Sequence, residues 1–314
     1  MDVRHVAVAG TGMMGPGIAA TFALAGRQAT IVSRTAESAA RGIATAKSLI
    51  EILAANGLAD PAQAKDAVTR LSSSTDPEAA VRAVQLFVES IPEDLATKQA
   101  FFARLDSASP DTILCSNTSG ISITAIAEKA SRPERIVTTH FWNPPHLMPL
   151  VEVSVGKQTS PRIADGVMAL LRACGKVPVL VHHDRPGQLG NRIQHAMIRE
   201  CVNIVQEGIA TAEDVDLAVK TGVGLRLPVY GVFEHADMVG LDLVKAVQNY
   251  VLPDLSPDQE AGRLHQEKVA RGELGVKSGR GFLEWTPKKA EEVRARRDAF
   301  LVRFLRWQRE RALS

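Results

Sequence analysis

A histidine, a glutamate and a hydroxyl-rich turn stand near one another in the middle of the sequence. They occur in Ser116–Gly120 (SNTSG), His140–Pro144 (HFWNP) and Leu150–Val153 (LVEV). Oxidising a secondary alcohol by hydride transfer requires a base that takes the hydroxyl proton, and histidine suits this role because its pKa lies near neutral pH. A carboxylate on the other ring nitrogen fixes the tautomer and stabilises the imidazolium. We therefore predict His140 as the base and Glu152 as its partner.

A glycine-rich turn near the N-terminus has the pattern of a phosphate-binding site. The segment GTGMMG follows a predicted strand at residue 10 and opens a predicted helix, and this is the context in which G-x-G-x-x-G binds a dinucleotide. The first glycine permits the tight turn, the second lets the backbone approach the pyrophosphate, and the third lets helix and strand pack closely. The pyrophosphate would lie on the helix N-terminus, where N–H groups favour negative charge. The predicted contacts are Gly10, Gly12, Met13, Met14 and Gly15.

The residues after the second predicted strand select between two dinucleotides. An acidic residue about 20 positions beyond the glycines binds the ribose 2′-hydroxyl of NAD, whereas an arginine accommodates the 2′-phosphate of NADP. Here the strand is followed by Ser33 and Arg34, and the first carboxylate is Glu37. From the residues alone, Ser33 and Arg34 favour NADP. The alternative is that Arg34 lies on the adenine face and that the site takes either cofactor.

Short apolar runs alternate with helical patterns through residues 1–185. This order predicts a Rossmann-type α/β domain, an open sheet of parallel strands with helices on both faces. Ligands bind at the carboxyl ends of such strands, so the three polar segments are expected to meet there. The predicted strands are 5–9, 29–32, 85–88, 112–115, 136–139, 150–153 and 178–181, and the first predicted helices are 15–26 and 35–55.

Helical signals replace strands after Asp184–Gly187. Thr211, with Asp214 three residues later, predicts a capped helix start. We predict an all-α domain over residues 186–286, with helices at 190–208, 211–222 and 232–251.

The tail, residues 287–314, holds nine Lys/Arg and four Asp/Glu. It is predicted to be a basic helix that packs on its own or a partner subunit. One face of this helix carries Val293, Phe300, Phe304 and Trp307.

The composition predicts a soluble globular protein of about two domains, since the chain has 314 residues, 45% of them hydrophobic and 23% charged. No run approaches the roughly 18 apolar residues of a membrane span. A net charge of +2 and an aromatic content of 4% give no reason to expect nucleic-acid binding. Three cysteines without a C-x-x-C pair predict a reducing, cytoplasmic location. No metal site is expected.

These motifs resemble those of the L-3-hydroxyacyl-CoA dehydrogenases, which include 3-hydroxybutyryl-CoA dehydrogenase. The family patterns S-N-T-S, H-F-F-N-P and L-V-E-V appear as SNTSG, HFWNP and LVEV. P-G-F-x-x-N-R appears as Pro186–Arg192 (PGQLGNR), and G-x-K-[ST]-G-x-G-F appears as Gly275–Phe282 (GVKSGRGF). Val88–Lys98 matches V-E-x-x-x-E-x-x-x-x-K. The resemblance covers nearly the whole chain.

The resemblance implies roles for the matching residues. His140 and Glu152 would form the acid–base pair. Ser119 would bind the substrate oxygen, and Asn191 would orient the substrate carbonyl and the histidine. The resemblance further implies NAD as cofactor, fatty acid metabolism, and a homodimer formed through the C-terminal domain. The cofactor contacts would be Glu93, Lys98, Asn117, Asn143 and Lys277.

Four departures from the family pattern bear on the substrate and the cofactor. Ser33 replaces the usual aspartate. The segment near residues 45–70, where the family often carries lysines for the CoA phosphates, has few cations, and a lysine of the family is absent from Pro144–Leu150 (PPHLMPL). Gly222–Arg226 (GVGLR) is similar to L-gulonate 3-dehydrogenase and carnitine dehydrogenase, which act on free hydroxy acids. Arg226 would then pair with a substrate carboxylate, or else lie at a helix end.

The sequence leaves the substrate open. It is either an L-3-hydroxyacyl-CoA thioester or a free hydroxy acid or aromatic carboxylate. Pyridine-carboxylate dehydrogenases of vitamin B6 breakdown are similar relatives with an N-P-P-H stretch, which makes His146 a candidate for the substrate pocket or, equally, a plain loop histidine.

Two remoter alternatives fit less well. The 6-phosphogluconate and 3-hydroxyisobutyrate dehydrogenases use a lysine base on the interdomain helix, which here carries Asn191 and Arg192 and no lysine before Lys220. A non-catalytic, crystallin-like relative would have no need of the retained serine, histidine, glutamate and asparagine.

Overall fold

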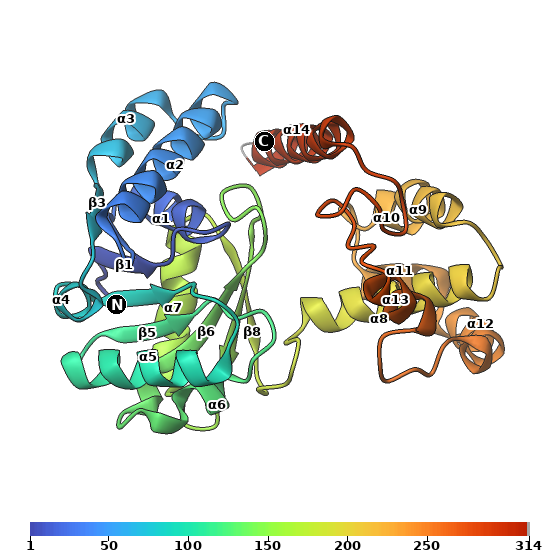
Figure 1. Ribbon diagram of the computed structural model, residues 1–314, viewed down its shortest axis with the longest axis horizontal. Coiled ribbons are helices and arrows are strands. Elements are labelled where there is room, and N and C mark those ends of the chain that lie inside the picture. The colour runs from blue at the N-terminus through green and yellow to red at the C-terminus, as the bar shows by residue number, and fades with distance from the viewer. Residues whose placement is uncertain (313–314) are drawn as a thin grey trace. The chain divides into compact units, whose positions relative to one another are not determined.

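The computed structural model describes residues 1–312 and folds into two compact units (Figure 1). Unit 1 comprises residues 1–191 and the described residues from Arg297 onward, and unit 2 comprises Arg192–Arg296. In the sequence, unit 2 is therefore an insertion into unit 1. The predicted domains 1–185, 186–286 and 287–314 remain predictions. Within the described part of the chain, no helix is long and apolar enough to cross a membrane.

Unit 1 contains one eight-stranded sheet with the order β3-β2-β1-β4-β5-β6-β7-β8. Neighbouring strands are parallel except β6 and β7. The strands are β1 His5–Ala9, β2 Gln28–Val32, β3 Leu71–Ser74, β4 Leu86–Glu89, β5 Ile113–Ser116, β6 Ile136–Phe141, β7 Leu150–Val155 and β8 Val177–Val181.

The seven predicted strands are all present, and the sheet differs from the prediction in two ways. β3 was not predicted, because its sequence LSSS lacks an apolar run and the strand lies at the edge of the sheet. The expectation of parallel strands throughout was wrong for β6 and β7. A parallel connection needs a crossover of about a dozen residues, and the segment 142–149 is too short for one.

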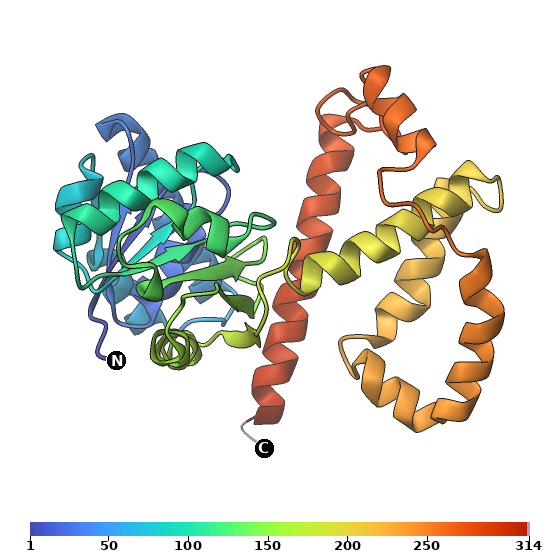
Figure 2. The ribbon, with the colours of Figure 1, turned by 90° about the horizontal axis from the view of Figure 1, so that it is seen from below.

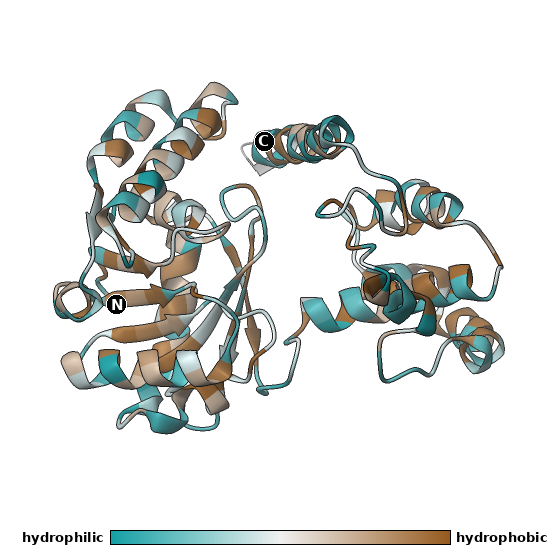
Figure 3. Cartoon of the chain, viewed as in Figure 1, coloured by the Kyte–Doolittle hydropathy of each residue, from teal (hydrophilic) through white to brown (hydrophobic). Residues whose placement is uncertain are grey.

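Helices cover both faces of the sheet (Figure 2), and side chains that alternate along each strand feed two cores. Val6 and Val8 pack in one core with α1, α2 and α7, whereas Ala7 and Ala9 pack in the other with α4, α5 and α6. The strands are accordingly among the most hydrophobic parts of unit 1 (Figure 3). The helices of these two layers are α1 Gly15–Leu24, α2 Ala36–Ala55, α3 Pro61–Thr69, α4 Pro77–Arg82, α5 Leu95–Ala108, α6 Ile123–Ile126 and α7 Pro161–Ala173, with 3₁₀ turns η1 Ala127–Lys129 and η2 Pro133–Arg135.

The described part of unit 2 is helical apart from isolated bridges near Arg280. The predicted cap is confirmed, because the Thr211 hydroxyl accepts a hydrogen bond from the Asp214 N–H at 3.1 Å. The predicted helix 232–251 is two helices, separated by Gly240 with a φ of 96°. The helices are α8 Gly190–Gln206, which begins in unit 1, and α9 Ala212–Thr221, α10 Val223–Arg226, α11 Val232–Val239, α12 Leu241–Val251 and α13 Arg263–Ala270, with the 3₁₀ turn η3 Leu252–Asp254.

The predicted tail helix is α14, Pro287–Ala312. Its packing face in unit 1 is not the aromatic face read from the sequence. Val302, with Leu301 and Leu305 beside it, packs on Leu53, Leu58 and Leu147. Phe300 is 54% exposed and Trp307 is 40% exposed. Phe304 lies between them, stacked on Phe300 and tilted against Trp307. The aliphatic residues through which α14 packs on unit 1 therefore stand one or two positions along the chain from the aromatic residues.

This packing makes a testable prediction about stability. Val302→Ala should lower the free energy of unfolding by about 2 kcal/mol, because it removes buried methyl groups and leaves a cavity. Phe300→Ala should cost less than about 1 kcal/mol although it removes a larger side chain, since most of that ring is exposed. Urea unfolding of both variants measures the difference. A larger loss for Phe300→Ala would show that the aromatic face is the packed one.

Candidate active site

His140 and Glu152 are directly paired across the antiparallel β6–β7 ladder. Nδ1 of His140 lies 2.7 Å from Oε2 of Glu152. Both side chains are buried, and Glu152 has no exposed surface. The pair predicted from the sequence therefore forms, but through cross-strand register and not through a meeting of parallel strand ends.

Glu152 accepts further hydrogen bonds that stabilise its ionised form. Trp142 Nε1 donates to Oε2 at 2.9 Å, and the backbone N–H groups of Leu189 and Gly190 donate to Oε1 at 2.9 and 2.7 Å. Burial by itself raises the pKa of Glu152, but the bonds from His140, Gly190, Trp142 and Leu189 outweigh it and lower the pKa to about 2. Because the carboxylate is ionised and only accepts, it holds the proton on Nδ1 of His140. Nε2 is then the nitrogen that can take up a proton.

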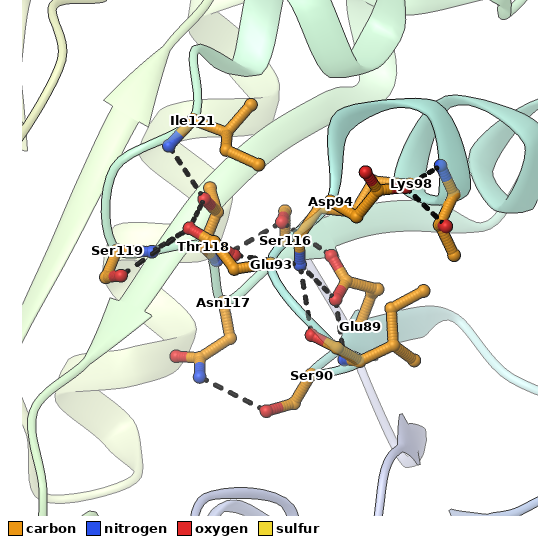
Figure 4. A network of polar contacts seen from close by, with 12 residues as sticks. Glu89, Ser90, Glu93, Asp94, Lys98, Ser116, Asn117, Thr118, Ser119 and Ile121 are labelled. Carbon is orange, nitrogen blue, oxygen red and sulfur yellow. Dashed lines mark hydrogen bonds and ion pairs between the residues drawn. The ribbon is translucent and has the colours of Figure 1, made fainter. Parts of the chain in front are cut away.

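Glu93 shapes the loop that carries Ser119 (Figure 4). Its Oε1 accepts hydrogen bonds from the Thr118 hydroxyl at 2.5 Å, the Ser119 N–H at 3.0 Å and the Gly120 N–H at 3.2 Å. Burial acts to raise the pKa of Glu93, but Thr118 and Lys98 together with the Gly120 N–H lower it. An ionised Glu93 thus holds three successive residues after β5 in one conformation.

A buried ion pair lies beneath this loop (Figure 4). Lys98 Nζ is 2.6 Å from Glu89 Oε1 and 3.3 Å from Glu93 Oε2. The Ser116 hydroxyl donates to the other oxygen of Glu89 at 2.6 Å. Lys98 is only 1% exposed, and in this structure its ammonium contacts the two glutamates and the Ile91 carbonyl, the latter at 3.3 Å. Its predicted contact with the cofactor remains a prediction, as does that of Glu93.

The turn before α8 and the first turn of that helix are tied to the same loop. Asn191 Nδ2 donates to the Ser119 carbonyl at 2.8 Å, and Gln188 Nε2 donates to the Thr118 carbonyl at 2.9 Å. Gln188 Oε1 accepts from the Ser154 hydroxyl at 3.2 Å. Gln188 is buried and has a φ of 49°, a conformation uncommon for residues other than glycine. These bonds bring Ser119 and Asn191 together and connect them to the strand that carries Glu152, while the predicted roles of both residues toward the substrate remain predictions.

The glycine turn meets the steric demands of a dinucleotide site. A Cβ on Gly10, which has a φ of 115°, would lie 2.2 Å from the Ser90 carbonyl oxygen. A Cβ on Gly15 would lie 1.9 Å from the Gly10 carbonyl oxygen, whereas a Cβ on Gly12 would have no neighbouring atom of the described chain within 4 Å. Met14 provides no side-chain cap at the start of α1. The turn therefore presents bare backbone and an uncapped helix start to an anion, and the residues fit the phosphates of a dinucleotide.

Besides Ser33 and Arg34, four further predicted residues lie in unit 1. Asn117 bridges two strand ends, since its Nδ2 donates to Ser90 Oγ at 3.3 Å and its Oδ1 accepts from the Phe141 N–H at 2.8 Å. Asn143 is exposed just after β6, and Met13 is exposed in the glycine turn. His146 is half-buried near Lys176 and Asp298, and its buried Nδ1 has no hydrogen-bond partner among residues 1–312. Their predicted contacts with cofactor or substrate stay predictions.

Arg226 and Lys277 lie in unit 2, on α10 and after α13. Both are exposed. Their predicted roles at the substrate and at the cofactor also remain predictions.

Sequence reasoning missed three side chains that organise the site. Glu89 was visible inside the V-E-x-x-x-E-x-x-x-x-K pattern, but no role was assigned to it. Trp142 stands in the HFWNP motif. The sequence could not show that its indole N–H donates to Glu152, because that contact depends on the register of β6 and β7. Gln188 occupies the phenylalanine position of the family's P-G-F-x-x-N-R, and this exchange of an apolar for a polar residue was the signal available.

Comparison with known proteins identifies the family. A family model described as 3-hydroxyacyl-CoA dehydrogenase, NAD binding domain, matches residues 5–185. A second model, the C-terminal domain of the same enzymes, matches residues 187–285. The chain belongs to the 3-hydroxyacyl-CoA dehydrogenase family. This confirms the predicted family and the predicted combination of a Rossmann-type domain with a helical domain, and it makes the protein an NAD-dependent oxidoreductase of this family.

Two kinds of relative in the 3-hydroxyacyl-CoA dehydrogenase family are similar to the chain. The 5-formyl-3-hydroxy-2-methylpyridine 4-carboxylate 5-dehydrogenase of Mesorhizobium japonicum is 34% identical over 96% of both chains. A crystal structure of a 5-dehydrogenase for that substrate, described as an NAD⁺-dependent dismutase, has a TM-score of 0.90 and covers 97% of this chain and 99% of its own. The probable 3-hydroxybutyryl-CoA dehydrogenase of Bacillus subtilis is 37% identical, over 92% of this chain and 99% of its own. The (S)-3-hydroxybutyryl-CoA dehydrogenase of Ralstonia eutropha is 34% identical, with a TM-score of 0.75 and 91% of this chain covered.

The environment of His146 predicts a pH effect on stability. Burial lowers the pKa of His146 to about 4, with nearby Lys176 and Arg297 acting in the same direction and Asp298 opposing them. The unfolded chain therefore takes up a proton between about pH 6.5 and pH 4 that the folded chain does not, so stability falls as the pH falls through this window. The thermal midpoint of wild type should drop more between pH 7 and pH 4.5 than that of His146→Gln. His182→Gln, an exposed control, should behave as wild type does, and equal slopes for wild type and His146→Gln would contradict the prediction.

Proposed function

We propose that the protein oxidises the secondary hydroxyl of an L-3-hydroxyacyl substrate to a ketone by general acid–base catalysis at His140. The observation that carries the proposal is the 2.7 Å contact between His140 Nδ1 and the ionised Glu152. With Nδ1 protonated, Nε2 accepts the hydroxyl proton while the carbinol hydrogen leaves as hydride. Bound NAD supplies the acceptor for that hydride. The imidazolium formed at His140 is stabilised by the carboxylate behind it.

The loop after β5 supplies the groups that position the substrate. Ser119 is exposed, and its backbone N–H is fixed by Glu93, which supports a hydroxyl that hydrogen-bonds the reacting oxygen. Asn191 is bonded to the Ser119 carbonyl, which supports a role in orienting the acyl group beside it. In the reverse direction the His140 imidazolium returns the proton to the substrate oxygen.

His140→Ala should lower kcat by at least about 100-fold, which is the lower range for loss of a general acid–base group. Glu152→Gln should have a similar effect, since the amide cannot stabilise the imidazolium. Dinucleotide affinity, measured by calorimetry, should be unchanged in both variants, and thermal midpoints would check their folding. Near-normal turnover by folded His140→Ala would rule out this mechanism.

One observation favours a second candidate substrate class, a free hydroxy acid or aromatic carboxylate. In unit 1, α14 packs on Leu53 and Leu58. Both residues belong to the helical hairpin formed by α2 and α3, and the family resemblance places the CoA phosphates on this hairpin, near residues 45–70. Few cations remain on the hairpin itself, and Arg70 is paired with Asp66 at 3.7 Å. The family model ends at residue 285, before α14 begins, whereas the pyridine-carboxylate structure covers 97% of the chain.

A substrate comparison separates the two classes. On the α14 argument, we expect kcat/KM for free 3-hydroxy acids or hydroxylated pyridine carboxylates to exceed that for 3-hydroxybutyryl-CoA by at least about tenfold, because α14 covers the segment where the headgroup would form its charge-assisted hydrogen bonds. Both classes are assayed at the same pH with the same dinucleotide. A preference for the CoA thioester would return the assignment to fatty acid metabolism and would contradict the argument from α14.

We also propose a homodimer formed through unit 2. Its support is the number of large apolar side chains that are exposed on the helices of this unit, such as Phe233 at 86% and Tyr250 at 88%, since exposed apolar patches mark protein interfaces. We also propose that the protein is cytoplasmic. Its support is that the three cysteines, Cys115, Cys174 and Cys201, are free thiols, as expected in a reducing compartment.

A further inference from the structure

A surface hollow lies beyond the carboxyl end of β2, beside the glycine turn. It has a volume of about 320 Å³ and is lined by Ser33, Arg34, Thr35, Ser38 and Arg41. Each lining side chain carries a hydroxyl or a guanidinium, and none is a carboxylate. The hollow therefore has the chemistry of an anion site, on the domain that binds the dinucleotide.

Two contacts connect the hollow to the phosphate-binding turn. The Ser38 hydroxyl is 2.7 Å from the hydroxyl of Thr11, which stands between the first two glycines. A Cβ on Gly42 would lie 2.8 Å from Thr11 Cγ2, so α2 approaches the turn closely. The turn also lies against the end of β2, since the Gly10 N–H donates to the Val32 carbonyl at 2.9 Å. One dinucleotide can therefore occupy the turn with its pyrophosphate and the hollow with its adenosine ribose.

The two arginines of the hollow differ in whether they already form an ion pair within the protein. Arg34 is exposed and forms no hydrogen bond or ion pair within residues 1–312. Arg41 forms an ion pair with Glu37 one helical turn earlier. Because the Glu37 side chain is 83% exposed, this pair stays hydrated and weak. A phosphate in the hollow would gain a free guanidinium from Arg34 and compete readily for Arg41.

We infer that this hollow binds the 2′-phosphate of NADP, so that the protein takes NADP(H) in addition to NAD(H) and binds it more tightly. The inference rests on the dinucleotide-binding role of unit 1. A carboxylate at the end of β2 would accept from a ribose 2′-hydroxyl and repel a 2′-phosphate. Ser33 removes that repulsion, Arg34 offers a planar fork to the phosphate oxygens, and Arg41 adds a second cation that the sequence motif alone did not point to.

Calorimetry on the full-length protein with adenosine fragments tests the inference without turnover. Adenosine 2′,5′-bisphosphate should bind at least about tenfold more tightly than 5′-AMP at low salt, as expected for charge-assisted hydrogen bonds. Adenosine 3′,5′-bisphosphate has the same charge and should lack most of this advantage. Arg34→Ala should remove most of the difference and Arg41→Ala part of it. Arg172→Ala, an exposed arginine on α7, is the matched control and should leave it unchanged.

The outcomes separate this inference from the proposed reaction. Equal affinity for adenosine 2′,5′-bisphosphate and 5′-AMP, an equal gain with the 3′,5′ isomer, or a gain that survives Arg34→Ala would each overturn it. Ser33→Asp, which adds the missing carboxylate, should reverse the preference towards 5′-AMP and towards NADH in kcat/KM. If the fragments bind as expected but no hydroxy acid or thioester is oxidised, the 2′-phosphate site stands and the proposed substrate class fails.

Discussion

The site depends on a carboxylate that is buried and yet ionised. Glu152 has no exposed surface, and a charge in that position is tolerated only because hydrogen-bond donors surround it. His140 supplies one, Trp142 another, and the backbone at the start of α8 supplies two more. The same bonds that stabilise the charge set the histidine tautomer and fix the turn that leads to Asn191. Acid–base chemistry and local architecture are therefore consequences of one interaction.

A second buried charge network has the same design. The Lys98–Glu89 pair lies under the loop after β5, and Glu93 extends the network to the backbone of Ser119 and Gly120. Removing one partner from such a pair leaves an uncompensated buried charge, which is strongly destabilising. The loop that positions Ser119 thus derives its shape from side chains that need not touch the substrate. Gln188 and Asn191 hold it from the other side, through the carbonyls of Thr118 and Ser119.

The sequence was informative where chemistry is local in the chain. The glycine turn, the capped start at Thr211 and the long apolar strands could be recognised because each depends on a few consecutive residues. The register of β6 against β7, which brings His140 to Glu152, depends on how a short connection turns back, and spacing alone could not separate it from parallel strands meeting at their ends. The edge strand LSSS could not be predicted from its composition. It is a strand because its backbone pairs with β2, and it has no apolar run that would mark it in the sequence. On α14 the aromatic pattern was conspicuous, but Val302 packs because the hairpin offers a matching apolar surface, which no pattern within the helix encodes.

The insertion of unit 2 into unit 1 has a consequence for biosynthesis. Leu53, Leu58 and Leu147 are made early, whereas the part of α14 that covers them follows the whole of unit 2 in the chain. During translation, the dinucleotide-binding unit can form its sheet and still leave this apolar surface bare while about a hundred residues of helices are added. The final packing of unit 1 must therefore wait for a segment synthesised after the second unit. We expect the nascent chain to pass through a state that has a folded core but exposes an apolar surface on one side. Such states are prone to aggregation and are the kind that chaperones bind.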